Sequence, residues 1–122
     1  MNALENRTVL VVEDEWLVRM ELVAAFEDQG CIVVESPSAE DALALLRGSS
    51  RIDLMVTDIR LSGPMTGWDL APEARLLRPD IAVIYVSANP PAIGRDVAGS
   101  VFIDKPALVG QVLGAASRLL SE

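Results

Sequence analysis

The sequence predicts a doubly wound α/β fold, in which helices cover both faces of a parallel β-sheet. Five short apolar runs are typical of strands that are buried on both faces, as parallel strands are. Five helical stretches alternate with these strands along the chain. The length of 122 residues fits one domain, which we predict over residues 1–122. In such sheets the crossovers are right-handed and ligands bind beyond the carboxyl ends of the strands.

The strands are indicated by compact runs rich in Val, Ile and Leu, several of which end in charged or hydroxyl side chains. The predicted strands cover residues 8–14, 31–36, 52–59, 81–88 and 100–106. Because each run is too short for a packed helix and is followed by polar residues, a buried strand is the better interpretation.

The helices are indicated by apolar spacing and by start and stop signals. They are predicted over residues 15–30, 38–50, 68–79, 89–99 and 107–122. Ser38 is a predicted N-cap with Asp41 three residues later, and Gly30 ends the first helix. Pro72 either starts or kinks the third helix. The stretch 89–99 is a poor helix former because it holds two prolines and two glycines.

An apolar stripe is predicted to face the core from the first helix. Its members are Trp16, Leu17, Met20, Val23, Ala24 and Phe26.

Composition excludes several classes of function. The net charge is −8 and the basic residues are scattered, which argues against direct nucleic-acid binding. The absence of histidine excludes a histidine base, metal ligand or phosphohistidine within this chain. The single Cys31 cannot form an internal disulfide and is predicted to be a buried thiol. No apolar run is long enough for a membrane span or signal peptide, so we expect a cytoplasmic protein.

Polar side chains collect at the predicted carboxyl ends of the strands. They are Glu13, Asp14 and Glu15 after the first strand, Asp58 in the third, Ser87 in the fourth and Lys105 in the fifth. Carboxylates brought together repel one another, and a hard cation such as Mg²⁺ would relieve this repulsion. Lys105 is the single lysine of the chain, and a compact ammonium group here could neutralise an acid and hold a phosphoryl oxygen.

Four of these strand ends match the motifs of a known family in order. They read "VVEDE", "LMVTDIRL", "YVSANP" and "VFIDKP". Along its whole length the chain resembles a response regulator receiver domain of two-component signalling, of the single-domain, chemotaxis-regulator-like kind. The resemblance implies a flavodoxin-like fold, with a five-stranded parallel sheet in the order 2-1-3-4-5 and five helices.

The resemblance also implies a role for each motif residue. Asp58, Lys105 and Ser87 would be catalytic, Glu13, Asp14, Asp58 and the backbone carbonyl of Arg60 would bind Mg²⁺, and Ser87 and Phe102 would act as the conformational switch. Asp58 would accept a phosphoryl group from a phosphohistidine, and Pro106 would follow a cis peptide bond. Such a domain catalyses its own phosphorylation and dephosphorylation, but it is mainly a switch.

The chain departs from the family pattern in the loop that follows Asp58. Ser62 stands at the usual proline position, and Gly63 and Pro64 lengthen the loop by about one residue. Thr66 precedes Gly67, where the family often has an acidic residue or asparagine. At the switch position Phe102 replaces the commoner tyrosine, so no ring hydroxyl is available there.

The expected partner is a sensor histidine kinase or a histidine phosphotransfer protein. Since no DNA-binding segment follows in this sequence, we expect output through a downstream protein partner that contacts 89–99, the fifth strand and the last helix. We expect no direct nucleic-acid partner and no membrane.

Two alternatives stay open. A Mg²⁺-dependent aspartyl-phosphate phosphatase usually has a second aspartate where this chain has Arg60, and a phosphorylation-independent receiver-like binding module would not require the complete set of acids, serine and lysine.

Overall fold

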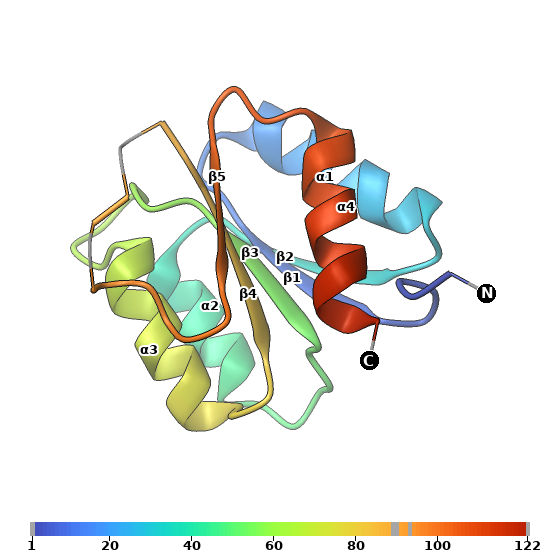
Figure 1. Ribbon diagram of the computed structural model, residues 1–122. Helices are drawn as coiled ribbons and strands as arrows, with labels where there is room; N and C mark the ends of the chain where they lie inside the picture. Colours follow the sequence, from blue (N-terminus) through green and yellow to red (C-terminus); the bar gives the residue numbers. More distant parts are fainter. Residues whose placement is uncertain (1, 89–90, 93, 122) are drawn as a thin grey trace.

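A computed structural model describes residues 2–88, 91–92 and 94–121 of the chain. Its sheet has five strands in this described part, all parallel, in the order β2-β1-β3-β4-β5 (Figure 1). The strands are β1 Thr8–Val12, β2 Ile32–Ser36, β3 Leu54–Thr57, β4 Ala82–Ser87 and β5 Val101–Asp104. The predicted flavodoxin-like sheet and its strand order are confirmed.

Helices cover both faces of this sheet. They are α1 Trp16–Asp28, α2 Ala39–Leu46, α3 Gly67–Leu77 and α4 Val109–Leu120. Figure 1 shows α1 and α4 on one side of the sheet and α2 and α3 on the other. Ser38 caps α2 by accepting a hydrogen bond from the Asp41 amide, as predicted. None of the helices in the described part is long and apolar enough to cross a membrane.

The central strands β1, β3 and β4 bury both of their faces because each face of the sheet has its own apolar core. In β1, Val9 and Val11 contact the cluster under α1 and α4, and Leu10 and Val12 contact the cluster under α2 and α3. This alternation follows from the two-residue period of a strand. The central strands are therefore rigid supports for the side chains that follow their carboxyl ends.

The prediction of five helices is wrong by one for the part of the chain that the structure describes. Between β4 and β5, the described residues 91–92 and 94–100 form no helix and include turns at 94–95 and 98–99. Residues 89, 90 and 93 of the predicted helix lie outside the described residues. Gly94 and Gly99 have φ angles of 80° and 74°, which a right-handed helix does not allow. The glycines thus provide the physical reason for the missing helix.

The stripe predicted for α1 is also wrong in part. Trp16, Leu17 and Met20 are 59%, 63% and 53% exposed, and Ala24 is exposed as well. Phe26 is buried as predicted, but its buried neighbours on the helix are Leu22 and Ala25, which the predicted stripe did not include. Apolar residues occur on most sides of α1, so their spacing alone does not single out one face.

Candidate functional site: the pocket at the strand ends

The register of the sheet brings the carboxyl ends of four strands to one edge. Val12 of β1 pairs with Thr57 of β3, and Ser87 of β4 pairs with Asp104 of β5. The ladder continues one residue further, because the Asp58 amide donates to the carbonyl oxygen of Val12 over 3.1 Å. Residues that follow these strands must therefore lie close together.

Lys105 links three of the acidic side chains through its ammonium group. Its Nζ atom lies 2.7 Å from Oδ2 of Asp58 and 3.0 Å from Oε1 of Glu13. A longer ion pair of 3.7 Å joins it to Glu15, whose side chain is exposed. The amide of Lys105 also donates to the carbonyl oxygen of Ser87 over 2.9 Å, which fixes β5 beside β4 at this point. The position of the single lysine is thus explained by the carboxylates it neutralises.

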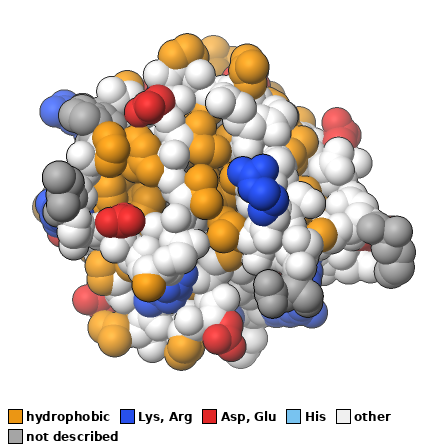
Figure 2. Space-filling view, in the orientation of Figure 1, with side chains coloured by type: hydrophobic (Ala, Val, Ile, Leu, Met, Phe, Trp, Pro, Cys, Tyr) orange, Lys and Arg blue, Asp and Glu red, His pale blue; other side chains and the backbone are white. Residues whose placement is uncertain are grey.

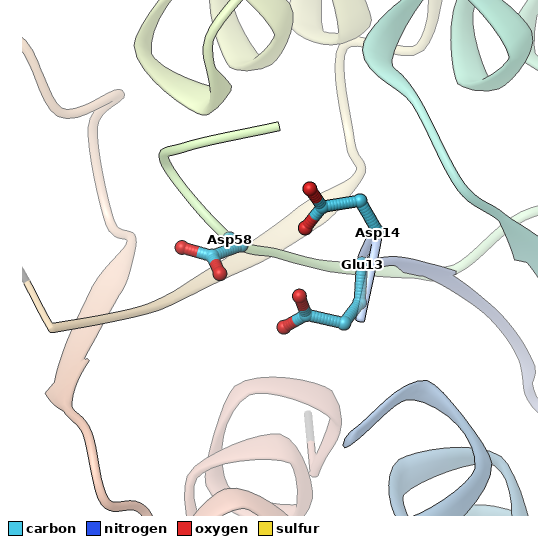
Figure 3. Close-up of side chains that lie close together, drawn as sticks. All are labelled: Glu13, Asp14 and Asp58. Carbon is cyan, nitrogen blue, oxygen red and sulfur yellow. The ribbon is translucent and has the colours of Figure 1, made fainter. Parts of the chain in front are cut away.

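Three carboxyl groups surround one small space at the ends of β1 and β3 (Figure 3). Glu13, Asp14 and Asp58 each offer one oxygen, and these oxygens lie within 4.8 Å of one another. Glu13 and Asp58 are buried, whereas Asp14 is exposed. An all-oxygen set of this kind suits a hard cation such as Mg²⁺, which keeps several waters and needs few protein ligands.

The carboxylates border an open cavity of about 450 Å³. Its lining residues are Asp14, Glu15, Asp58, Arg60, Ala88 and Lys105. The cavity gives a small ligand or a partner's side chain direct access to Asp58.

The electrostatics of the site depend on burial. Burial raises the pKa of Glu13 to about 7, and the nearby Asp58 carboxylate adds to this rise, while the hydrogen bond from Lys105 opposes it. For Lys105, burial favours the neutral form, but the hydrogen bonds to Asp58 and Glu13 outweigh it and raise its pKa. Lys105 therefore stays charged, and Glu13 carries a proton on part of the molecules at neutral pH.

The affinity of the pocket for Mg²⁺ should consequently depend on pH. A metal ligand must be deprotonated, so acid should weaken binding once Glu13 takes up its proton, at about pH 7. The apparent affinity should fall about tenfold for each pH unit below this value if one proton is released per metal ion bound. Calorimetric titration with Mg²⁺ from pH 5.5 to 8, values chosen to span that pKa, measures this slope. Glu13→Gln should remove the slope, and an equally steep profile in this variant would contradict the prediction.

The loop after Asp58 is held by a close approach to α3. The Gly67 amide donates to the carbonyl oxygen of Ile59 over 2.8 Å, and the Ile59 amide donates to Oδ1 of Asp58 over 2.6 Å. Thr66 and Asp69 form a capping box that starts α3 at this point. Pro72 lies inside α3 and does not start it. The carboxyl group of Asp58 is thus oriented by the backbone of its own loop.

The lengthened part of this loop is attached to the start of α2. Ser62 forms an isolated bridge with Ser38, and the Met65 amide donates to Oε2 of Glu40 over 3.3 Å. Gly63 has a φ angle of 94°, which allows the extra turn beside Glu40. The lengthened loop therefore lies beside the first turn of α2.

Replacing Gly67 by alanine should destabilise the domain. A Cβ atom at this position would collide with the carbonyl oxygen of Asp58 and lie 3.0 Å from the Cα atom of Ile59, and neither backbone atom can move independently. We expect a loss of about 1–3 kcal/mol in the free energy of unfolding, as for other overpacked sites. Urea unfolding of Gly67→Ala measures the loss. The matched control is Gly110→Ala, because a Cβ atom there meets no atom within 4 Å and should cost nothing. Equal stability of the two variants would contradict the prediction.

The other predicted site residues border this pocket. Ser87 is fully buried at the end of β4, and its neighbour Ala88 lines the cavity. Arg60 has an exposed side chain at the rim of the cavity. Pro106 follows a cis peptide bond, as expected.

Phe102 belongs to an aromatic cluster away from the carboxylates. Its ring is stacked on Trp68 at a centroid distance of 6.0 Å and lies 6.4 Å from the ring of Tyr85. The hydroxyl group of Tyr85 accepts a hydrogen bond from the Val97 amide over 3.1 Å. The sequence alone did not reveal Tyr85 and Trp68 as neighbours of Phe102, because they come from distant elements.

The family model of the response regulator receiver domain matches residues 9–108, which is most of the chain and includes the pocket described above. The chain belongs to this family. As a receiver domain it is 32% identical to the sensor kinase CckA of Brucella abortus (strain 2308), over 96% of this chain and 13% of that protein. It is 38% identical to the two-component response regulator PhoP of Pseudomonas aeruginosa, over 66% of this chain and 35% of that protein. The chain thus spans a minor part of both relatives.

Solved structures agree with this family. A response regulator receiver protein from Sinorhizobium medicae WSM419 matches with a TM-score of 0.89 and 31% identity, over 97% of each chain. The receiver domain of the hybrid histidine kinase CckA matches with a TM-score of 0.81 and 25% identity, over 93% of this chain and 98% of that one. The receiver domain described here therefore has relatives in proteins named as kinases and as response regulators.

Proposed function

We propose that this receiver domain accepts a phosphoryl group on Asp58 from a phosphohistidine of a partner protein in a Mg²⁺-dependent reaction. One observation carries the proposal. The Asp58 carboxylate is 2.7 Å from Lys105, belongs to a cluster of three acids and opens on a cavity. A buried nucleophile beside a fixed cation and a set of oxygen ligands meets the main requirement of phosphoryl transfer, which is positioning with charge neutralisation.

In this reaction an oxygen of Asp58 attacks the phosphorus atom. The new bond joins this oxygen to phosphorus, and the phosphorus–nitrogen bond of the donor breaks with its electron pair returning to the imidazole. Lys105 and the Ile59 amide orient the carboxylate before attack, since they hold Oδ2 and Oδ1 respectively. Glu13, Asp14, Asp58 and the Arg60 carbonyl would hold Mg²⁺, which supplies positive charge to the phosphoryl oxygens. Water that enters through the cavity later hydrolyses the aspartyl phosphate.

Ser87 and Phe102 are the proposed switch. Ser87 ends β4 beside the pocket, and Phe102 lies in β5 with its ring against Trp68 and Tyr85. A shift of Ser87 toward the phosphoryl group would open space for the Phe102 ring, and the neighbouring aromatic rings would then repack. The Tyr85–Val97 hydrogen bond would carry this change to the segment between β4 and β5.

A downstream protein is the proposed recipient of this change. Figure 2 shows hydrophobic side chains gathered in the middle of the face on which β5 lies in Figure 1. Val101 and Phe102 of β5 are half-buried, and they follow residues 94–100 in the sequence. Partly exposed apolar side chains of this kind are typical of protein-binding surfaces.

The donor is proposed to be a sensor histidine kinase or a histidine phosphotransfer protein in the cytoplasm. The exposed side chains of Trp16, Leu17 and Met20 support a protein donor, because they lie in the first turns of α1, directly after the acidic residues of the pocket. A protein that covers them would be close to Asp58. The homology to CckA, a sensor kinase, is consistent with a kinase as partner.

The test uses phosphoramidate, a small donor that also has a phosphorus–nitrogen bond. Intact-protein mass spectrometry should show the gain of one phosphoryl group in the presence of Mg²⁺ and no gain with excess EDTA. Hydroxylamine should remove the group, because it cleaves acyl phosphates, and peptide mapping should locate it at Asp58. A label that resists hydroxylamine or lies on another residue would refute the proposal. Continuous release of phosphate from simple phosphate monoesters would favour a phosphatase instead.

A further inference from the structure

We infer that Arg19 is a positioning residue for the metal site, because its guanidinium group fixes the turn that carries Glu13 and Asp14. The inference rests on the proposed function, since it takes the acidic pocket as a site for a divalent cation. Arg19 lies on α1, outside the cavity and outside the family motifs named above. It acts on the acidic ligands through the backbone and through β2.

The contacts of Arg19 join three elements at one point. Its Nη1 atom donates to the carbonyl oxygen of Glu13 over 2.7 Å, and its Nε atom donates to Oε1 of Glu35 over 2.9 Å. Glu35 belongs to β2, so the guanidinium group connects α1, the β1–α1 turn and the neighbouring strand. The side chain of Arg19 is only 19% exposed. A planar fork that donates in two fixed directions is a rigid connector, which a lysine cannot reproduce.

Hydrogen bonds also hold the other polar groups of Glu13. Its amide donates to the carbonyl oxygen of Ser36 over 3.0 Å, and its Oε2 atom accepts from the Glu15 amide over 3.2 Å. Lys105 donates to its Oε1 atom over 3.0 Å. The hydrogen bond from Arg19 engages the carbonyl oxygen of Glu13, and it thereby fixes the peptide plane between Glu13 and Asp14. Since Asp14 is exposed, the direction of its side chain depends on this plane.

The direction in which Mg²⁺ affinity changes when Arg19 is removed distinguishes a positioning role from a purely electrostatic role. Arg19 is a cation close to the acids, so its charge alone opposes the binding of Mg²⁺, and its removal would tighten binding. Loss of orientation acts in the opposite direction, because residues that hold metal ligands in place typically contribute about 10–100-fold in metal affinity. Where Glu13 is fully deprotonated, weaker binding after the positive charge is removed therefore indicates lost geometry.

Calorimetric titration with Mg²⁺ tests the inference on the whole chain, at a pH well above the pKa of Glu13 so that this ligand is deprotonated in every variant. The variants are Arg19→Gln, Arg19→Lys and the control Arg51→Gln. Arg51→Gln makes the same change in net charge on an exposed arginine that pairs with Asp53 at the opposite end of the sheet. We expect Arg19→Gln to bind Mg²⁺ about tenfold more weakly. Arg19→Lys should lose a smaller factor in Mg²⁺ affinity, because lysine keeps the positive charge and one of the two hydrogen bonds. Arg51→Gln should bind Mg²⁺ as tightly as the unmodified chain does.

Urea unfolding of each variant is measured alongside, so that affinity is compared only between folded proteins. If Arg19→Gln does not fold, Arg19→Lys decides, and unchanged Mg²⁺ affinity in that variant overturns the inference. Unchanged or tighter binding by folded Arg19→Gln overturns it as well, while the proposed function stands. If the unmodified chain takes up no Mg²⁺ at all, the proposed function fails together with the inference. Phosphorylation by phosphoramidate is measured separately, so that failure of the Arg19 inference alone is distinguished from failure of the proposed function.

Discussion

Asp58→Asn should abolish phosphorylation of the receiver domain. The amide is nearly the same size as the carboxyl group and its oxygen can still accept the hydrogen bond from the Ile59 amide, so the fold should be retained. An amide oxygen is a poor nucleophile, and one of the three acidic ligands is lost as well. Intact-protein mass spectrometry after incubation with phosphoramidate and Mg²⁺ should show no mass gain, whereas the unmodified chain gains one phosphoryl group.

Asp14→Asn is the matched control for this experiment. It removes the same charge from the same acidic cluster but leaves the proposed nucleophile in place. We expect slow phosphorylation of this variant that increases with the concentration of Mg²⁺, because only metal affinity is reduced. Phosphorylation of Asp58→Asn at an unchanged rate would show that another residue is the acceptor.

Lys105→Met should destabilise the metal-free domain and slow phosphorylation. Lys105 contacts the buried Glu13 and Asp58, and its side chain is only 17% exposed. Removal of one partner from a buried charge cluster leaves uncompensated charge and typically costs about 3–5 kcal/mol. Methionine retains most of the apolar stem, so the loss can be assigned to the ammonium group. Loss of one fixed cation at the reacting group should also reduce the rate of phosphorylation about a hundredfold.

Mg²⁺ should restore part of the stability that Lys105→Met loses. A divalent cation supplies the charge that is missing, and a ligand that binds only the folded state stabilises it. The increase in melting temperature on addition of Mg²⁺ should therefore be larger for this variant than for the unmodified chain. Arg51→Met is the control, because the exposed Arg51–Asp53 pair should contribute about 0–1 kcal/mol. Unchanged stability of metal-free Lys105→Met would contradict the prediction.

The sheet and the membership of the pocket could be predicted from the sequence because both depend on short-range patterns. Each strand is a compact apolar run, and parallel strands bring their carboxyl ends together in any doubly wound sheet. Glu13, Asp14, Asp58 and Lys105 follow directly from the ends of their strands. Their proximity in space confirms this arrangement, while their chemical roles remain predictions.

Other features could not be predicted because they depend on packing between distant segments. The contact of Arg19 with the carbonyl oxygen of Glu13 leaves no signal in spacing, since an arginine on a helix usually faces solvent. The exposed face of α1 was missed because apolar residues surround that helix. The helix predicted before β5 is wrong for the described residues. Strands and helices usually alternate in this fold, but Gly94 and Gly99 have positive φ angles that interrupt a helix.

The segment before β5 is held by few hydrogen bonds, which lowers the free energy needed to change its conformation. In the described part of this segment, Val97 is joined to Tyr85 by one hydrogen bond and Arg95 to Asp69 by one exposed ion pair of 3.2 Å. A packed helix is held by a ladder of backbone hydrogen bonds, whereas the described part of this segment has two backbone hydrogen bonds of its own, from the Arg95 amide to Ala92 and from the Ser100 amide to Val97. Under the proposed function, we therefore expect a phosphoryl group on Asp58 to change the conformation of this segment at a small cost in free energy.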